Sequence, residues 1–183
     1  MRLSKPRVEM MEQSDWDEEQ NQIMNRNFPD LVPPNIHKTI IHHTKLMKRW
    51  MVFANHVLNK SSLPGREREM AILRTGWLCR AGYEWAHHVE IGKREGLTQE
   101  EIEAIKHGPD AQVWSDLDRS LLRAVEELLN DCFISDDTWN ALSQKFNQQQ
   151  LMDIVFAVGN YNLVSMALNT LGVQLEEGYV NEV

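Results

Sequence analysis

Three side chains that can carry out acid–base chemistry lie close together in the sequence: Glu69, Glu84 and His88. Carboxylates and imidazoles are groups that often transfer protons in enzymes near neutral pH. The residues around them are largely apolar and have helical periodicity. Because Glu84 and His88 are four positions apart, they lie on the same face of a helix. We therefore expect a carboxylate and an imidazole to interact on one helix.

Glu69 reaches His88 only if the chain bends between them. On one straight helix their separation of 19 residues would span roughly 28 Å. A glycine inside a helix costs about 1 kcal/mol relative to alanine, and Ala81-Gly82 lies between the two residues. The sequence therefore predicts two helices, 66–80 and 83–95, with a bend at Ala81-Gly82. His87 lies about 100° around the second helix, so we expect it at the surface or at a subunit contact.

The whole chain has the pattern of an all-α protein. Apolar residues recur at helical spacing, β-branched residues fall inside these helical stripes, and the connections are short, as in a helical bundle. Capping residues and Gly or Pro mark the helix ends. We expect a first helix opened by Ser14 and Asp17 and ending before Phe28, then helices at 36–43, 44–59, 66–80 and 83–95, a short one opened by Thr98 and Glu101, one opened by Ser115, one at 135–146, and a long apolar one from Asn147 to about Leu171.

Length and composition limit the remaining possibilities. A chain of 183 residues forms one domain or two small fused halves, and we divide it into an N-terminal segment (1–34), a helical domain (35–175) and a tail (176–183). The net charge of −8 argues against a nucleic-acid partner. The two cysteines, Cys79 and Cys132, and the polar N-terminus predict a reducing, cytoplasmic location without disulfides. We expect no membrane-spanning segment.

Two segments carry a resemblance to a known family: REREMAILRTGWLCRAGYEWAHHVEIGKREGLTQEEI and LMDIVFAVGNYNLVSMALNTLGVQL. From about Asp15 to Gln174 the chain resembles the carboxymuconolactone decarboxylase and alkylhydroperoxidase D-like family, which implies an alkylhydroperoxidase D-like helical bundle. The alkylhydroperoxidase branch has a Glu, a Cys-x-x-Cys pair and a His. In this chain the Glu and His positions fall on Glu69 and His88, whereas the two Cys positions fall on Ala81 and Glu84. The chain is therefore similar to the subgroup with Tyr-Glu-Trp-x-x-His.

The resemblance implies roles for the motif residues. Glu69 would be a partly buried carboxylate that orients His88, and His88 would be a general acid or base in a pocket. Glu84 is either a structural carboxyl, hydrogen-bonded or paired with an arginine, or a second acid–base group. Tyr83 and Trp85 either pack in the core or bind substrate in an aromatic pocket.

Several other readings follow from polar residues in the sequence. The Glu84-x-x-His87 pattern occurs in bundles that bind two metal ions, but such a site needs a second copy, and the sequence has none. We therefore expect no metal and no cofactor. Asn160 and Asn162 interrupt an apolar helix, so they should bond buried groups, at a subunit interface or in the pocket.

The leading hypothesis is a cofactor-independent lyase or isomerase that acts on a small carboxylated lactone or carbonyl metabolite. His88 would move the proton and an arginine would bind a substrate carboxylate. One alternative is a peroxidase of the alkylhydroperoxidase D type that uses Cys79 or Cys132. The other is a non-catalytic assembly protein. The resemblance also implies self-association, as a trimer or hexamer, and the long apolar helix fits burial on several sides.

Overall fold

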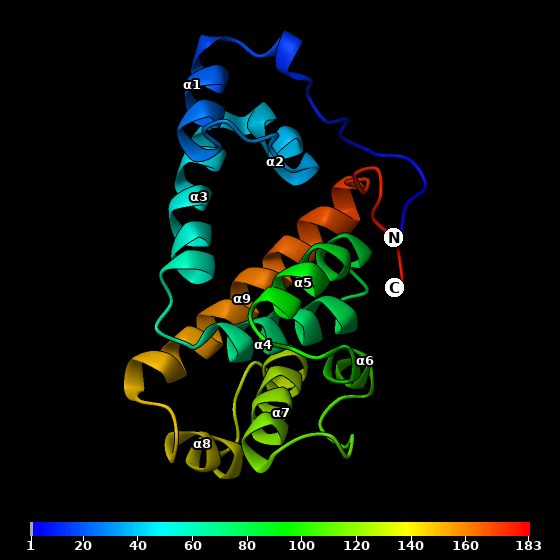
Figure 1. The fold of residues 1–183 in the computed structure, drawn as a ribbon. Helices are drawn as coiled ribbons and strands as arrows, with labels where there is room; N and C mark the ends of the chain where they lie inside the picture. The colour runs from blue at the N-terminus through cyan, green and yellow to red at the C-terminus, as the bar shows by residue number, and fades with distance from the viewer. Residues whose placement is uncertain (1) are drawn as a thin grey trace.

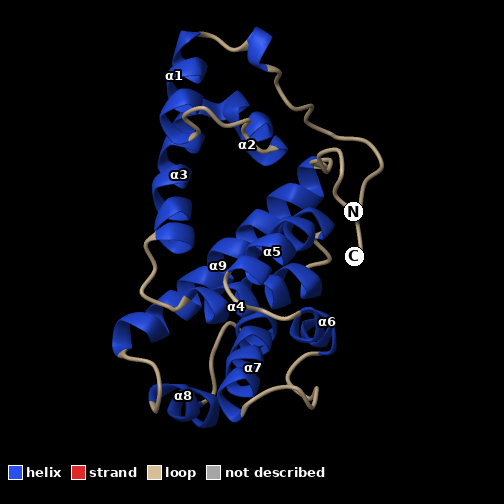
Figure 2. Cartoon of the chain, viewed as in Figure 1, coloured by secondary structure: helices blue, strands red, loops and turns tan. Residues whose placement is uncertain are grey.

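The computed structural model describes residues 2–183, which form nine α-helices, two short 3-10 helices and no strand (Figures 1 and 2). The predicted all-α fold is confirmed. The helices are α1 (Glu18–Asn27), α2 (Asn35–Ile40), α3 (Thr44–Asn59), α4 (Gly65–Leu78), α5 (Gly82–Arg94), α6 (Gln99–His107), α7 (Asp116–Asp131), α8 (Asp136–Ser143) and α9 (Gln148–Leu171), with 3-10 turns at Gln13–Asp15 and Ile41–His43.

Side-chain caps fix several helix starts where the sequence predicts them. Thr98, Ser115 and Asn147 each accept a hydrogen bond from a backbone N–H in the first turn of α6, α7 and α9, in complete capping boxes. Two predicted boundaries are wrong. Asp17 alone caps α1, so this helix begins after Ser14 and its 3-10 turn. Helix α8 ends at Ser143, before 146, because the chain must become extended for Asn147 to cap α9.

Helix α4 lies at the centre of the molecule. It contacts α5, α6, α7 and α9, and its residues 68–76 are all buried. In Figure 1, α4, α5 and α9 lie together in the middle of the molecule, with α7 and α8 at one end and α1 to α3 at the other. A polar side chain on α4, such as that of Glu69, is therefore held inside the protein.

The predicted bend between the two motif helices is present, but Gly82 is not the residue that makes it. Arg80 adopts the left-handed conformation, with φ at 51°, and Gly82 is the first residue of α5. The N–H of Ala81 donates to the carbonyl of Gly76, at 2.9 Å, which closes the end of α4. Because α5 then runs back along α4, residues on the two helices come into contact.

The N-terminal residues pack against the rest of the chain at two places. Trp16 and Met24 join Ile41 and Met47 in a small apolar cluster between α1 and α3. Before α1, the N–H of Arg7 donates to a carbonyl at the end of α9, at 2.8 Å. The segment before α1 and the C-terminal tail therefore meet at the end of α9, as Figure 1 shows.

One helix is long and apolar enough to cross a membrane when it is judged by length and composition alone. This helix is α9, and it is the only such helix in residues 2–183. Half of its most apolar 18-residue window is buried inside the protein, however, as in a helix that belongs to a protein core. The burial of Ile154, Ala157 and Leu168 against neighbouring helices gives α9 this structural role.

Candidate functional site

Glu69, His88 and Glu84 form a continuous chain of hydrogen bonds, which we call the Glu–His–Glu chain. His88 Nδ1 lies 2.6 Å from Glu69 Oε2, and His88 Nε2 lies 2.8 Å from Glu84 Oε1. Glu69 is fully buried, and His88 and Glu84 are each only 5% exposed. The fold thus brings together the three residues that the sequence singles out. Glu69 comes from α4, whereas Glu84 and His88 are one turn apart on α5.

The two carboxylates determine the charge of the imidazole. Burial alone would lower the pKa of His88, but the adjacent Glu69 and Glu84 outweigh burial and raise it to about 10. Burial would likewise raise the pKa of Glu69, but His88 and Arg68 lower it overall. Arg68 Nε donates to Glu69 Oε1 at 3.0 Å, so Glu69 has a cationic partner on each side. At neutral pH, His88 is therefore an imidazolium that donates from both ring nitrogens.

This charge changes the roles available to the site. An imidazolium whose two N–H groups are both used cannot take a proton from a substrate. Glu84 and His88 both line a cavity, whereas Glu69 does not, so Glu84 is the carboxylate of the Glu–His–Glu chain that faces it. Glu84 is therefore the group placed to exchange a proton with a bound molecule, with His88 as its charged partner.

The cavity next to the Glu–His–Glu chain has a volume of about 300 Å³ and lies among α2, α3, α5 and α9. Its walls are mainly apolar and aromatic, and in the described part of the chain no Lys or Arg lines it. The aromatic rings are those of Phe28, His37, Trp50, Tyr83, His87, His88 and Tyr161, and the polar lining includes Asn160 and Glu84.

Tyr161 extends the site from α9. Its ring meets that of His88 edge to face, with centroids 4.9 Å apart and an interplanar angle of 83°. Burial and the two carboxylates, Glu84 and Glu69, raise the pKa of Tyr161 well above its usual value. Tyr161 therefore keeps its proton and can donate it in a hydrogen bond. The sequence offers little to identify it, because Tyr161 has the spacing of an ordinary core residue.

A residue of the C-terminal tail completes one edge of the cavity. Glu176 accepts hydrogen bonds from the Tyr83 hydroxyl and from the backbone N–H of Asn35, both at 2.7 Å, and its Oε2 lies 2.7 Å from His87 Nε2. The His87 ring also stacks between Tyr83 and Tyr179, with centroids 4.5 and 4.3 Å away. His87 is thus part of the cavity wall and not an exposed surface residue, whereas the alternative expectation of a subunit contact stays a prediction.

Of the remaining predicted site residues, some line the cavity and others are buried elsewhere. Tyr83 lines the cavity, but Trp85 does not. Trp85 is fully buried in the main core and packs against Trp77, with ring centroids 5.1 Å apart. Of the two asparagines, Asn160 lines the cavity, whereas Asn162 accepts a hydrogen bond from the Cys79 thiol at 3.4 Å.

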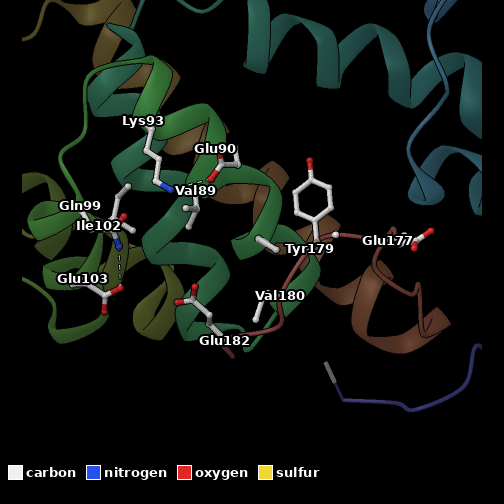
Figure 3. A pocket seen from close by; sticks show the side chains of 12 residues that line it. Val89, Glu90, Lys93, Gln99, Ile102, Glu103, Glu177, Tyr179, Val180 and Glu182 are labelled. Carbon is white, nitrogen blue, oxygen red and sulfur yellow. Dashed lines mark hydrogen bonds and ion pairs between the residues drawn. The ribbon is translucent and has the colours of Figure 1, made fainter.

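A second, larger cavity of about 570 Å³ lies between α5, α6 and the tail. Figure 3 shows charged side chains around it, including Glu90, Lys93, Glu103 and Glu182. None of the residues of the Glu–His–Glu chain lines it. Because its titratable groups are exposed or engaged in surface ion pairs, the smaller cavity is the candidate active site.

Comparison with known families supports the resemblance seen in the sequence. Residues 44–127 match the model of the Carboxymuconolactone decarboxylase family. The matched segment contains all three residues of the Glu–His–Glu chain. No curated protein matches the chain at a significant level.

Solved structures share the alkylhydroperoxidase D-like fold. The AhpD core of an uncharacterized peroxidase-related protein from Ralstonia eutropha JMP134 is 16% identical, with a TM-score of 0.79 over 94% of this chain and 93% of that one. The debrominase Bmp8 in complex with 2,3,4-tribromopyrrole is 14% identical, with a TM-score of 0.75 over 95% and 94%. A putative antioxidant defence protein AhpD from Agrobacterium tumefaciens is 20% identical, with a TM-score of 0.67 over 75% and 94%. At these identities the likeness establishes the fold.

The two cysteine thiols lie outside the cavity lining. Cys79, at the end of α4, is half-buried, and Cys132 is exposed at the end of α7. Burial raises the pKa of the Cys79 thiol, which lowers its thiolate fraction. Among residues 2–183, no group of three or more His, Cys, Asp or Glu is arranged to hold a metal ion. The titratable side chains that line the cavity are those of Glu84, three histidines and two tyrosines.

Proposed function

We propose that this protein is an acid–base enzyme that transfers a proton on a small carbonyl metabolite, as a cofactor-independent isomerase or lyase. One observation carries the proposal: the Glu–His–Glu chain ends in Glu84 at the wall of a mainly apolar cavity. A carboxylate at the wall of a mainly apolar cavity is a suitable base for a carbon acid, because a bound substrate can bring its C–H group next to it.

In the proposed reaction Glu84 takes a proton from the carbon next to the carbonyl group, and the C–H electrons move to form an enolate. His88 stays protonated and stabilises the carboxylate, while Tyr161 donates a hydrogen bond to the developing enolate oxygen. Returning the proton to another carbon completes an isomerisation. A decarboxylating lyase would reach the same enolate by losing CO₂ and would then protonate it at carbon, but its substrate carries a carboxylate for which the cavity wall offers no free cation, so the isomerase reaction is favoured. Glu69 and Arg68 act as positioning residues for His88.

The carbonyl substrate fits the cavity better than the carboxylated lactone that the family name suggests. A substrate carboxylate needs a free cationic donor, and the arginines of α4 are already engaged. Arg66 is paired with Asp118 and Glu101, and Arg74 with Glu126. Because these arginines are absent from the cavity wall, we assign the substrate to neutral carbonyl compounds.

Hydrogen–deuterium exchange at carbon tests the proposal without knowledge of the natural product. The protein would be incubated in D₂O with a panel of small ketones, lactones and enones, and NMR would follow deuterium at the carbon next to the carbonyl. We expect exchange with the native protein and a loss of at least about 100-fold in Glu84→Gln. Glu90→Gln, an exposed change on the same helix, is the matched control. Undiminished exchange in Glu84→Gln would remove the basis of the assignment.

Thiol-dependent peroxide reduction is the second candidate, favoured by the fold shared with peroxidase-related proteins. It requires Cys79 or Cys132 to react, although neither lines the candidate active site. A variant with both cysteines replaced by serine separates the two functions. Peroxide turnover that disappears in this variant would support the thiol reaction, and proton exchange that persists in it would support the acid–base reaction.

We also propose that the protein self-associates through α3 and α9. Large apolar side chains are exposed on both helices, and Phe53 meets Phe156 edge to face with centroids 6.1 Å apart. Contiguous exposed apolar residues of this kind are typical of subunit interfaces. Further members of the face are Val52, Met152, Leu163 and Met166. Light scattering tests this, since a monodisperse monomer would contradict it.

A further inference from the structure

We propose that the cavity beside His88 binds a neutral, planar small molecule that bears an N–H or O–H group, and that Asn160 accepts the hydrogen bond from this group. The inference rests on the proposed function for the choice of cavity, and it adds the chemical class of the ligand. Four observations support it: an unused acceptor, an unused imidazole nitrogen, aromatic walls, and the absence of a free cation.

The unused acceptor is the side-chain oxygen of Asn160. Asn160 lies on α9, lines the cavity and is only 4% exposed, yet its Oδ1 has no hydrogen-bond partner within residues 2–183. Buried polar atoms in proteins nearly always have a partner, so each exception needs an explanation. This oxygen is closed off in the structure, so a ligand donor in the cavity would satisfy it after a rotation of the Asn160 side chain toward the cavity.

The unused imidazole nitrogen belongs to His37 on α2, another residue of the cavity wall. Its Nδ1 is buried and also lacks a partner in the described chain. Burial lowers the pKa of His37 to about 4, with a smaller contribution from His87, and outweighs Glu176 and an interaction with the Pro34 carbonyl, which raise it. His37 is therefore neutral at physiological pH and offers a hydrogen-bonding nitrogen, without a charge that would attract an anion.

The aromatic walls favour a flat ligand. The His37 ring lies between Phe28 and Trp50, with centroids 4.5 and 5.7 Å away. Tyr83 and Tyr161 also line the cavity. Aromatic side chains interact favourably with other rings in stacked or edge-to-face arrangements. A volume of about 300 Å³ lies at the lower end for ligand pockets and suits a molecule of one or two rings.

The charges around the cavity exclude anions. Glu84 presents a carboxylate to it, and both ring nitrogens of His88 are already bonded to Glu84 and Glu69. His87 faces the cavity from α5, but its Nε2 is paired with Glu176. An anionic ligand would therefore meet a carboxylate without gaining an unpaired cation, which opposes its binding.

Three fluorinated probes of matched size test these properties. They are 4-fluorophenol (neutral, with a donor), 4-fluoroanisole (neutral, without a donor) and 4-fluorobenzoate (anionic). Fluorine NMR at neutral pH would give the affinity of each for the full-length protein. We expect 4-fluorophenol to bind about fivefold more tightly than 4-fluoroanisole, the ratio for one neutral hydrogen bond, and at least about tenfold more tightly than 4-fluorobenzoate.

Two variants locate the binding and identify the acceptor. Ala54 lines the cavity, so Ala54→Phe should abolish binding of 4-fluorophenol. Ala141→Phe, at a half-buried position on α8 outside the cavity, should not. Asn160→Leu should bring the affinities of 4-fluorophenol and 4-fluoroanisole together, because only the phenol loses a partner. Circular dichroism spectra identical to those of the native protein would show that the variants are folded.

Other outcomes overturn the proposal. The ligand class is wrong if 4-fluorobenzoate binds as tightly as 4-fluorophenol, or if 4-fluorophenol fails to bind at its solubility limit. The assignment of Asn160 as the acceptor is wrong if the folded Asn160→Leu variant still binds 4-fluorophenol more tightly than 4-fluoroanisole. The proposed function is tested separately by proton exchange in Glu84→Gln. If the probes bind selectively but Glu84→Gln exchanges protons as fast as the native protein, the binding site is supported and the acid–base role is rejected. If the probes show no selectivity but Glu84→Gln loses proton exchange, only the ligand class is rejected.

Discussion

The substitution Glu69→Gln tests the electrostatic basis of the site, because it removes one charge and largely preserves shape. Two independent arguments give the expected loss in the free energy of unfolding. Removing one partner of a buried ion pair costs about 3–5 kcal/mol. Raising the pKa of His88 from 6.5 to about 10 corresponds to about 5 kcal/mol, at 1.36 kcal/mol per pKa unit, from Glu69 and Glu84 together. Since Glu84 remains in the variant, we expect a loss of about 3 kcal/mol in the free energy of unfolding.

The same substitution should change how stability depends on pH. His88 has a raised pKa in the folded protein, so its contribution is fully present below pH 6.5 and is lost as pH rises toward about 10. Glu69 has a lowered pKa, so its contribution is present above its ordinary value of 4.5 and is lost as pH falls below it. The native protein should therefore lose stability on the alkaline side, and Glu69→Gln should lose less there.

Urea unfolding followed by tryptophan fluorescence, at a series of pH values, measures both effects. Glu90→Gln is the control, because it alters an exposed carboxylate on α5 and should change stability by less than about 0.5 kcal/mol. NMR titration of the His88 ring provides an independent check, since its pKa should fall in Glu69→Gln. A loss of stability below about 1 kcal/mol, together with an unchanged His88 pKa, would refute the account of the Glu–His–Glu chain.

Three further substitutions test the surroundings of the site. Glu176→Gln should loosen the tail and speed amide exchange of Asn35. In the native protein the hydrogen bonds from His87, Asn35 and Tyr83 outweigh burial and lower the pKa of Glu176 to about 2. The native tail should therefore loosen only as the pH falls from about 4.5 toward 2. Trp85→Ala should cost about 3–5 kcal/mol in urea unfolding, since it leaves a cavity in the main core; a cost near zero would contradict the core placement. Asn147→Ala removes the cap of α9 and should cost about 1 kcal/mol, and an unchanged midpoint would show that the cap contributes nothing.

Local chemistry explains why much of the fold could be predicted. A capping box is a contact between residues three positions apart, so Thr98, Ser115 and Asn147 reveal helix starts without knowledge of the tertiary structure. The bend between α4 and α5 follows from a requirement of the chemistry, because Glu69 and His88 cannot meet on one helix. The residue that adopts the left-handed conformation, Arg80, could not be foreseen, since arginine has no preference for it.

The parts of the site that escaped prediction depend on contacts distant in sequence. Glu176 lies in a tail without helical periodicity, and its partner Tyr83 is 93 positions away. Tyr161 and Trp85 both look like core residues in the sequence, yet one lines the cavity and the other does not. The charge of His88 also depends on two carboxylates from different helices. Periodicity indicates that a residue is buried, but it does not indicate which buried residues surround an empty volume.

If the proposed function is right, the position of Glu84 accounts for a change from thiol chemistry to proton chemistry on this fold. In the alkylhydroperoxidase branch that the motif resembles, a cysteine occupies the position of Glu84. The geometry of α5 brings whatever side chain stands there against the imidazole four residues later, as the 2.8 Å contact with His88 shows. A carboxylate in this position cannot form a disulfide, but it can accept and return a proton. Glu84→Cys alone should therefore abolish proton exchange without creating peroxide turnover, because the companion position is Ala81, which offers no resolving thiol.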